Sequence, residues 1–120
     1  MTDIKPKLSE LLIQLKAEYL IGFPLKIEKL KELTAREDWN QLYEEYHKLK
    51  GNGKTYGFPD ISIVAEKLEF LAQHEKGQNK ALYLDAIALL EQMHKSYSEN
   101  KAFPLDQDAF ARSLLALKIK

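Results

Sequence analysis

One short segment of the chain has residues that could serve either of two kinds of phosphate chemistry. The triplet Gly-Lys-Thr at 53–55 could end a nucleotide-binding loop, whereas His47 with Lys50 three residues later could form a phosphorylatable histidine beside a cation. A P-loop requires the pattern G-x-x-x-x-G-K-[ST], and Lys48 occupies the position of its first glycine. The segment also continues a helical pattern from Trp39 instead of following a strand. The sequence therefore argues against a nucleotide-binding loop.

His47 is the remaining candidate for chemistry. Apolar residues recur at Trp39, Leu42, Tyr46 and Leu49, a spacing that places their side chains on one face of a helix. His47 follows Tyr46 directly, which rotates it about 100° away from the centre of that face and toward solvent. An imidazole with the ordinary pKa of about 6.5 is largely neutral at neutral pH. One ring nitrogen is then a free nucleophile without an activating base.

The residues one and two turns after His47 suit a phosphoryl group. Lys50 and Gly51 follow at i+3 and i+4, and Lys54 at i+7 lies on the same side of the helix. A phosphoryl group brings about two negative charges, which Lys50 can offset, with Lys54 as a weaker second candidate. Gly51 and Gly53 each cost a helix interior about 1 kcal/mol relative to alanine. We expect Gly51 to clear space for a bulky partner and Gly53 to admit a neighbouring helix.

Tyr43 and Glu44, at i−4 and i−3, adjoin His47 on the other side. Glu44 could orient the imidazole, although a solvated surface carboxylate is the simpler interpretation. His74 and His94 could be considered as metal ligands, but no pair of histidines has the i, i+4 spacing of a helical metal site, and cysteine is absent. We therefore expect no metal site.

Helical periodicity predicts the elements that position His47. We expect an all-α fold: an antiparallel up-and-down four-helix bundle with additional terminal helices, formed by residues 1–120 as one domain. The predicted bundle core spans about 23–97. An N-terminal helix at about 8–20 should stop near Gly22 to Pro24, and Gly57 should end the helix that carries His47. A C-terminal helix at about 106–117 should turn Phe110 and Leu114 inward; capping of the bundle is favoured over a partner-binding tail ending near Ile119.

Composition limits the function classes. The chain has 120 residues, and 18 Lys plus Arg balance 18 Asp plus Glu, so it lacks the basic excess of a non-specific nucleic-acid binder. No apolar run approaches the roughly 18 residues of a membrane span, and no apolar signal core begins the chain. These observations predict a cytoplasmic protein that binds neither nucleic acid nor membrane. Nothing in the sequence demands more than a monomer.

Five residues in this region carry a family resemblance. His47, Leu49, Lys50, Gly51 and Gly57 together resemble the H-x-[LI]-K-G-x5-G signature of histidine-containing phosphotransfer (HPt) domains of two-component phosphorelays. Ile61 and the pair Leu68-Glu69 fall where that family has its next apolar residue and a leucine-acid dipeptide, and the resemblance extends over roughly residues 8–97. The chain departs from the family pattern at Tyr46, before the histidine, and at Asn52 and Lys54, where smaller residues are common.

The resemblance implies a phosphocarrier, not an enzyme with its own kinase or ATPase activity. It implies that His47 is phosphorylated, that Lys50 is its charge partner and that Gly51 gives clearance for the partner. The expected partners are response-regulator receiver domains and a hybrid sensor histidine kinase. The protein would need no cofactor of its own, because Mg²⁺ is expected on the receiver. The alternative is a non-covalent helical adaptor that keeps the bundle and does not use His47.

Overall fold

The residues that the structure describes are mostly helical. The computed structural model describes residues 4–75 and 80–117, and within these ranges 3₁₀ and α-helices are the only regular elements. In chain order they are α1 (Ile4–Ala35), α2 (Trp39–Thr55), α3 (Pro59–His74), α4 (Lys80–Ser98), the 3₁₀ helix η1 (Leu105–Gln107) and α5 (Ala109–Ala116).

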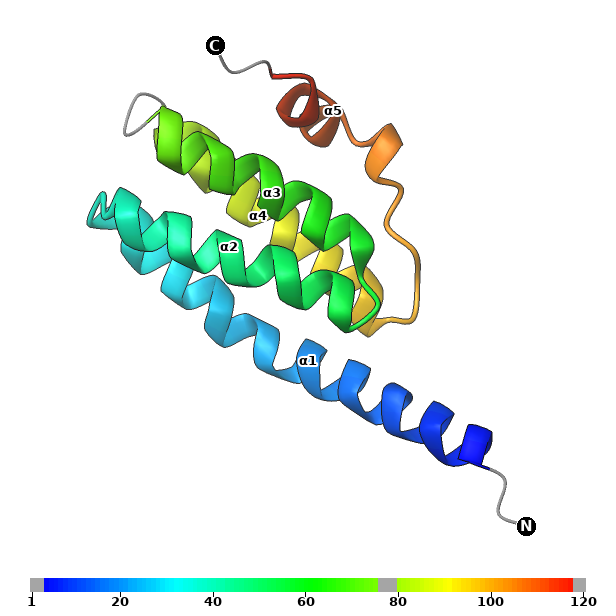
Figure 1. The fold of residues 1–120 in the computed structure, drawn as a ribbon. Helices are drawn as coiled ribbons and strands as arrows, with labels where there is room; N and C mark the ends of the chain where they lie inside the picture. Colours follow the sequence, from blue (N-terminus) through cyan, green and yellow to red (C-terminus); the bar gives the residue numbers. More distant parts are fainter. Residues whose placement is uncertain (1–3, 76–79, 118–120) are drawn as a thin grey trace.

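The four long helices form the predicted bundle. α1 to α4 run antiparallel to their neighbours, and α5 packs against α3 and α4 (Figure 1). Each contributes fully or almost fully buried side chains to one core, including Leu42, Leu68, Leu90 and Leu114. The all-α prediction is therefore confirmed. α5 begins three residues later than expected, after η1; Ile119 lies outside the described residues.

Two turns define the length of α2. Asp38 begins the helix, because its side chain accepts a hydrogen bond of 3.2 Å from the backbone N–H of Gln41. Gly57 follows its C-terminus with φ of 88°, a left-handed conformation that glycine adopts without steric cost. Pro59 then occupies the first turn of α3, where its missing N–H needs no partner. The prediction that Gly57 ends the His47 helix is confirmed.

The predicted break near Gly22 to Pro24 is wrong, because α1 continues through both residues. Pro24 has no N–H, so the carbonyl of Leu20 lacks its usual helical donor. Nε2 of His94, on α4, lies 2.7 Å from that carbonyl oxygen and donates in place of the missing N–H. The imidazole also stacks on Phe23, with ring centroids 5.4 Å apart. A residue on another helix thus compensates for the proline, which the local sequence does not reveal.

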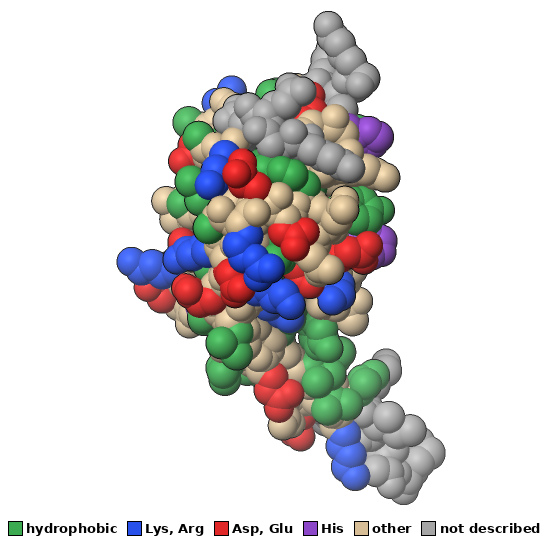
Figure 2. Space-filling model, turned by 90° about the vertical axis from the view of Figure 1, so that its left-hand side faces the viewer, with side chains coloured by type: hydrophobic (Ala, Val, Ile, Leu, Met, Phe, Trp, Pro, Cys, Tyr) green, Lys and Arg blue, Asp and Glu red, His purple; other side chains and the backbone are tan. Residues whose placement is uncertain are grey.

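The N-terminal part of α1 extends beyond the bundle. The helix predicted at about 8–20 is present, but it is the first part of α1 and projects past the other helices (Figure 1). Leu8, Leu11, Leu12 and Ile13 are exposed there, and hydrophobic side chains are visible on this projection in Figure 2. In the same view, acidic and basic side chains are interspersed on the bundle. Among the described helices, none is long and apolar enough to cross a membrane.

We predict that His94→Phe lowers the free energy of unfolding by about 1 kcal/mol, the usual contribution of one hydrogen bond. Phenylalanine can keep the stack on Phe23 but cannot donate to the Leu20 carbonyl. Urea denaturation measures the change. His74→Phe is the matched control, because His74 is exposed, and should stay within about 0.5 kcal/mol of the unmodified protein. Equal stability of both variants would contradict the proposed role of His94.

Candidate functional site

The side chain of His47 lies at the edge of the buried face of α2. Tyr46 is fully buried, whereas the His47 side chain is 56% exposed. His47 thus lies at the solvent-exposed edge of the helix, as its spacing from Tyr46 predicts. Tyr43, one turn earlier, lies beside the imidazole with the two rings nearly parallel, 14° apart, and their centroids separated by 6.2 Å.

A carboxylate from α3 links His47 to Lys50. Oε1 of Glu69 lies 3.3 Å from Nδ1 of His47, and Nζ of Lys50 lies 2.9 Å from Oε2 and 3.3 Å from Oε1. The Glu69 side chain is only 13% exposed and that of Lys50 is 32% exposed, so the pair is partly shielded from water. The hydrogen bond to Glu69 raises the pKa of Lys50 above its usual value, although partial burial opposes the shift. Lys50 is therefore charged at neutral pH.

This contact assigns different roles to the two imidazole nitrogens. A carboxylate can only accept hydrogen bonds, so Nδ1 of His47 must carry the proton when it bonds to Glu69. In the neutral ring, Nε2 then has a free lone pair. No hydrogen-bond partner for Nε2 is found among residues 4–75 and 80–117. The arrangement presents one nucleophilic nitrogen on an exposed side chain.

Two glycines near His47 have different surroundings. Gly51 is exposed, and a Cβ added there would meet no atom within 4 Å. Gly53 is buried, and a Cβ there would lie 2.7 Å from Oγ and 3.0 Å from the backbone nitrogen of Ser62. The Ser62 hydroxyl also donates a hydrogen bond to the backbone carbonyl of Lys50. The expected helix contact at Gly53 is observed, and the space beside Gly51 is open at the surface of this chain.

The close approach at Gly53 brings Glu69 to His47. His47 lies six residues before Gly53 on α2, and Glu69 lies seven residues after Ser62 on the antiparallel α3. These separations correspond to about 9 Å and about 10.5 Å along the two helices, so the two side chains reach the same level. Seven residues are also close to two full turns, which puts Glu69 on the Ser62 face of α3.

Three of the four secondary site residues, Glu44, Lys54 and Gly57, do not pair with the imidazole. Glu44 is exposed, and the carboxylate that pairs with His47 is Glu69, so the simpler interpretation of Glu44 as a surface carboxylate fits the geometry. Lys54 is exposed and forms no ion pair with any residue that the structure describes. Gly57 acts in the turn after α2. Tyr43 is the one secondary candidate whose ring lies beside His47.

The pairing role of Glu69 was missed by sequence reasoning. The helix over 59–74 contains three acidic residues, Asp60, Glu66 and Glu69, and which of them reaches His47 depends on how α3 is rotated against α2. The available signal is the seven-residue spacing from Ser62 together with the inward direction of Leu68, which is fully buried. Neither signal identifies Glu69 as the partner of His47 unless the contact between Gly53 and Ser62 is known.

The described part of the chain contains no group of three or more His, Cys, Asp or Glu residues that could hold a metal ion. The two histidines considered as ligands lie in unrelated places. His74 packs beside Phe70 at the surface of α3, with ring centroids 4.3 Å apart, and His94 donates to the backbone of α1.

Comparison with known proteins gives one family. The sequence model of the Hpt domain matches residues 14–100, which is well over half of the chain. No curated protein and no solved structure matches the chain.

We predict opposite effects of alanine at the two glycines near His47. Gly51→Ala should raise the free energy of unfolding by about 1 kcal/mol, because alanine favours the helix and its methyl group meets no neighbour. Gly53→Ala should lower it by about 1–3 kcal/mol, because the methyl group would overlap Ser62. Urea denaturation of both variants provides the test. Stabilisation by Gly53→Ala equal to that by Gly51→Ala would show that α3 does not need this close approach.

Proposed function

The chain belongs to the Hpt domain family, whose members carry phosphoryl groups in two-component signalling, and we propose that His47 is the carrier residue in this protein. The donor would be the aspartyl phosphate of a receiver domain, and the acceptor a second receiver. The single observation that best supports the proposal is the contact between Glu69 and Nδ1 of His47, because it leaves Nε2 as an exposed nucleophile.

The transfer step needs no base on this chain. Nε2 of His47 attacks the phosphorus atom of the aspartyl phosphate; an N–P bond forms as the P–O bond to the aspartate breaks, and the electron pair of that bond stays on the receiver's carboxylate. Nε2 carries no proton to remove, because the ring proton is on Nδ1. The phosphorylated ring then carries a positive charge, which Glu69, 3.3 Å from Nδ1, stabilises. Transfer to the next receiver reverses these steps.

The remaining residues of the site suit the charge and size of the partner. Lys50 is charged and lies one turn after His47, where it can offset the negative charge of the transferred group. Gly51 leaves open space beside the histidine for the receiver's active site. In this proposal the receiver, and not this chain, holds Mg²⁺ and the acidic pocket, and the exchange takes place in the cytoplasm.

We predict that His47→Gln abolishes phosphoryl transfer and leaves the fold intact. The test incubates each protein with radiolabelled, phosphorylated receiver domains and measures label on the chain, followed by acid and alkali treatment. Acid-labile, alkali-stable label is expected on the unmodified protein and on the control His74→Gln. Label retained by His47→Gln would refute the assignment. No transfer to the folded, unmodified protein from any receiver of the same organism would favour the non-covalent adaptor.

We predict that Glu69→Gln slows transfer about tenfold, since the amide keeps the shape of the side chain but removes the charge that holds Nδ1–H and stabilises the phosphorylated ring. Single-turnover transfer from a phosphorylated receiver measures the rate. Glu44→Gln is the matched control and should transfer at the normal rate, because Glu44 is exposed and does not pair with His47. A larger effect of Glu44→Gln than of Glu69→Gln would contradict the geometry.

A further inference from the structure

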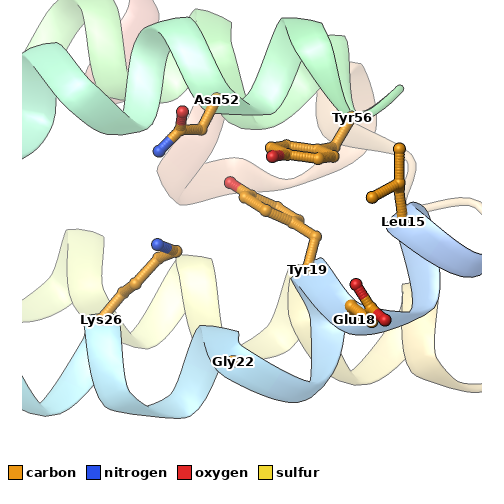
Figure 3. A pocket seen from close by; sticks show the side chains of 7 residues that line it. All are labelled: Leu15, Glu18, Tyr19, Gly22, Lys26, Asn52 and Tyr56. Carbon is orange, nitrogen blue, oxygen red and sulfur yellow. The ribbon is translucent and has the colours of Figure 1, made fainter.

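A pocket of about 260 Å³ lies between α1 and α2 (Figure 3). Leu15, Glu18, Tyr19, Gly22 and Lys26 contribute to it from α1, and Asn52 and Tyr56 from α2. Neither His47 nor Glu69 belongs to its lining, so the pocket is separate from the proposed phosphorylation site.

A buried hydroxyl group in this pocket has no partner. Tyr19 is only 7% exposed, and its Oη forms no hydrogen bond with any residue the structure describes. The ring is held in place by stacking on Tyr56, with centroids 5.0 Å apart, and on Phe58, with centroids 5.7 Å apart. Burial raises the pKa of Tyr19 above its usual value, and Tyr56 adds to the shift, so the hydroxyl keeps its proton and can donate. An unpaired buried donor normally costs stability, which a ligand would offset.

Two further donors lie beside this hydroxyl. Figure 3 shows the ends of the Tyr19, Lys26 and Asn52 side chains turned toward a common space. Nζ of Lys26 lies 5.7 Å from the centroid of the Tyr19 ring, and Lys26 forms no ion pair within the described ranges. The Asn52 amide has no hydrogen-bond partner there either. A cation, a hydroxyl and an amide together form a site for an oxyanion.

Gly22 supplies independent support for a ligand. A Cβ added at Gly22 would meet no atom within 4 Å, so packing of the described chain does not require glycine there. Glycine inside a helix nevertheless costs about 1 kcal/mol relative to alanine. Because Gly22 lines the pocket, its missing side chain leaves room for an occupant. Gly51 shows the same combination of helix interior and open space beside the proposed phosphorylation site.

We propose that this pocket binds a small organic anion that bridges α1 and α2. Its carboxylate or phosphate group would accept hydrogen bonds from Lys26 Nζ, Tyr19 Oη and the Asn52 amide, and its apolar body would contact Leu15 and Tyr56. Glu18 determines which way the ligand lies in the pocket. It is eight residues from Lys26, about 12 Å along the helix, and its carboxylate would repel an anionic group at that end of the pocket. Glu18 already accepts a hydrogen bond of 3.3 Å from Gln14.

Titration of the ¹⁵N-labelled full chain, monitored by NMR, tests the proposal. The probes are benzoate, which has a carboxylate on an apolar ring; benzamide, its neutral analogue; and inorganic phosphate. Saturable shifts of the Gly22 backbone amide and the Asn52 side-chain amide are expected with benzoate or phosphate and not with benzamide. Tighter binding of benzoate identifies a carboxylate ligand, and tighter binding of phosphate identifies a phosphate ligand.

Three variants link the shifts to the pocket. Lys26→Gln should weaken anion binding by at least about tenfold, as expected for loss of one charge-assisted hydrogen bond. Gly22→Leu should fill the pocket and abolish binding while leaving the helix intact, and Lys29→Gln, an exposed lysine on the same helix outside this pocket, should bind as the unmodified protein does. The proposal is overturned if neither anion gives saturable shifts, or if benzamide binds as well as benzoate.

Discussion

The Glu69 side chain lies mostly buried between α2 and α3, where its carboxylate pairs with both His47 and Lys50. A shielded carboxylate is costly unless charged or hydrogen-bonding groups surround it, so each of its partners is needed to keep it in place. The same contact holds Lys50 near His47 and directs the proton of the imidazole to Nδ1. The charge, orientation and nucleophilicity of the site therefore depend on one side chain contributed by the neighbouring helix.

Glycine makes this arrangement possible in two different ways. Gly53 allows α3 to approach α2 closely, and this contact places Glu69 beside His47. Gly51 has no such neighbour, and the space beside it is open to solvent. Packing within the bundle explains Gly53, whereas Gly51 faces open space that the bundle does not fill. Gly22 on α1 also faces open space.

Periodicity in the sequence predicts the helix that carries His47, because Leu42, Tyr46 and Leu49 repeat at helical spacing and are buried as expected. The exposure of His47 follows from the same repeat. The turn at Gly57 is also predictable, since a glycine after the helical repeat, followed two residues later by Pro59, is a local signal of a helix end. These features depend on residues close together in the chain, which is why the sequence alone is sufficient for them.

The features that sequence reasoning missed depend on residues far apart in the chain. α1 continues past Pro24 because His94, on the last helix of the bundle, donates to the Leu20 carbonyl. The partner of His47 is Glu69, on a different helix, and not the nearby Glu44. In both cases local spacing predicts the candidate groups, but the packing of one helix on another decides which of them meet.

The site depends on Glu69 holding the proton of His47 on Nδ1, which leaves Nε2 free. Long-range ¹H–¹⁵N correlation NMR of the imidazole rings measures this directly in the unphosphorylated protein, at a pH where His47 is neutral. We expect Nδ1 to carry the proton and Nε2 to have the chemical shift of a bare nitrogen. A proton on Nε2 with a bare Nδ1 would show that Glu69 does not hold the ring proton.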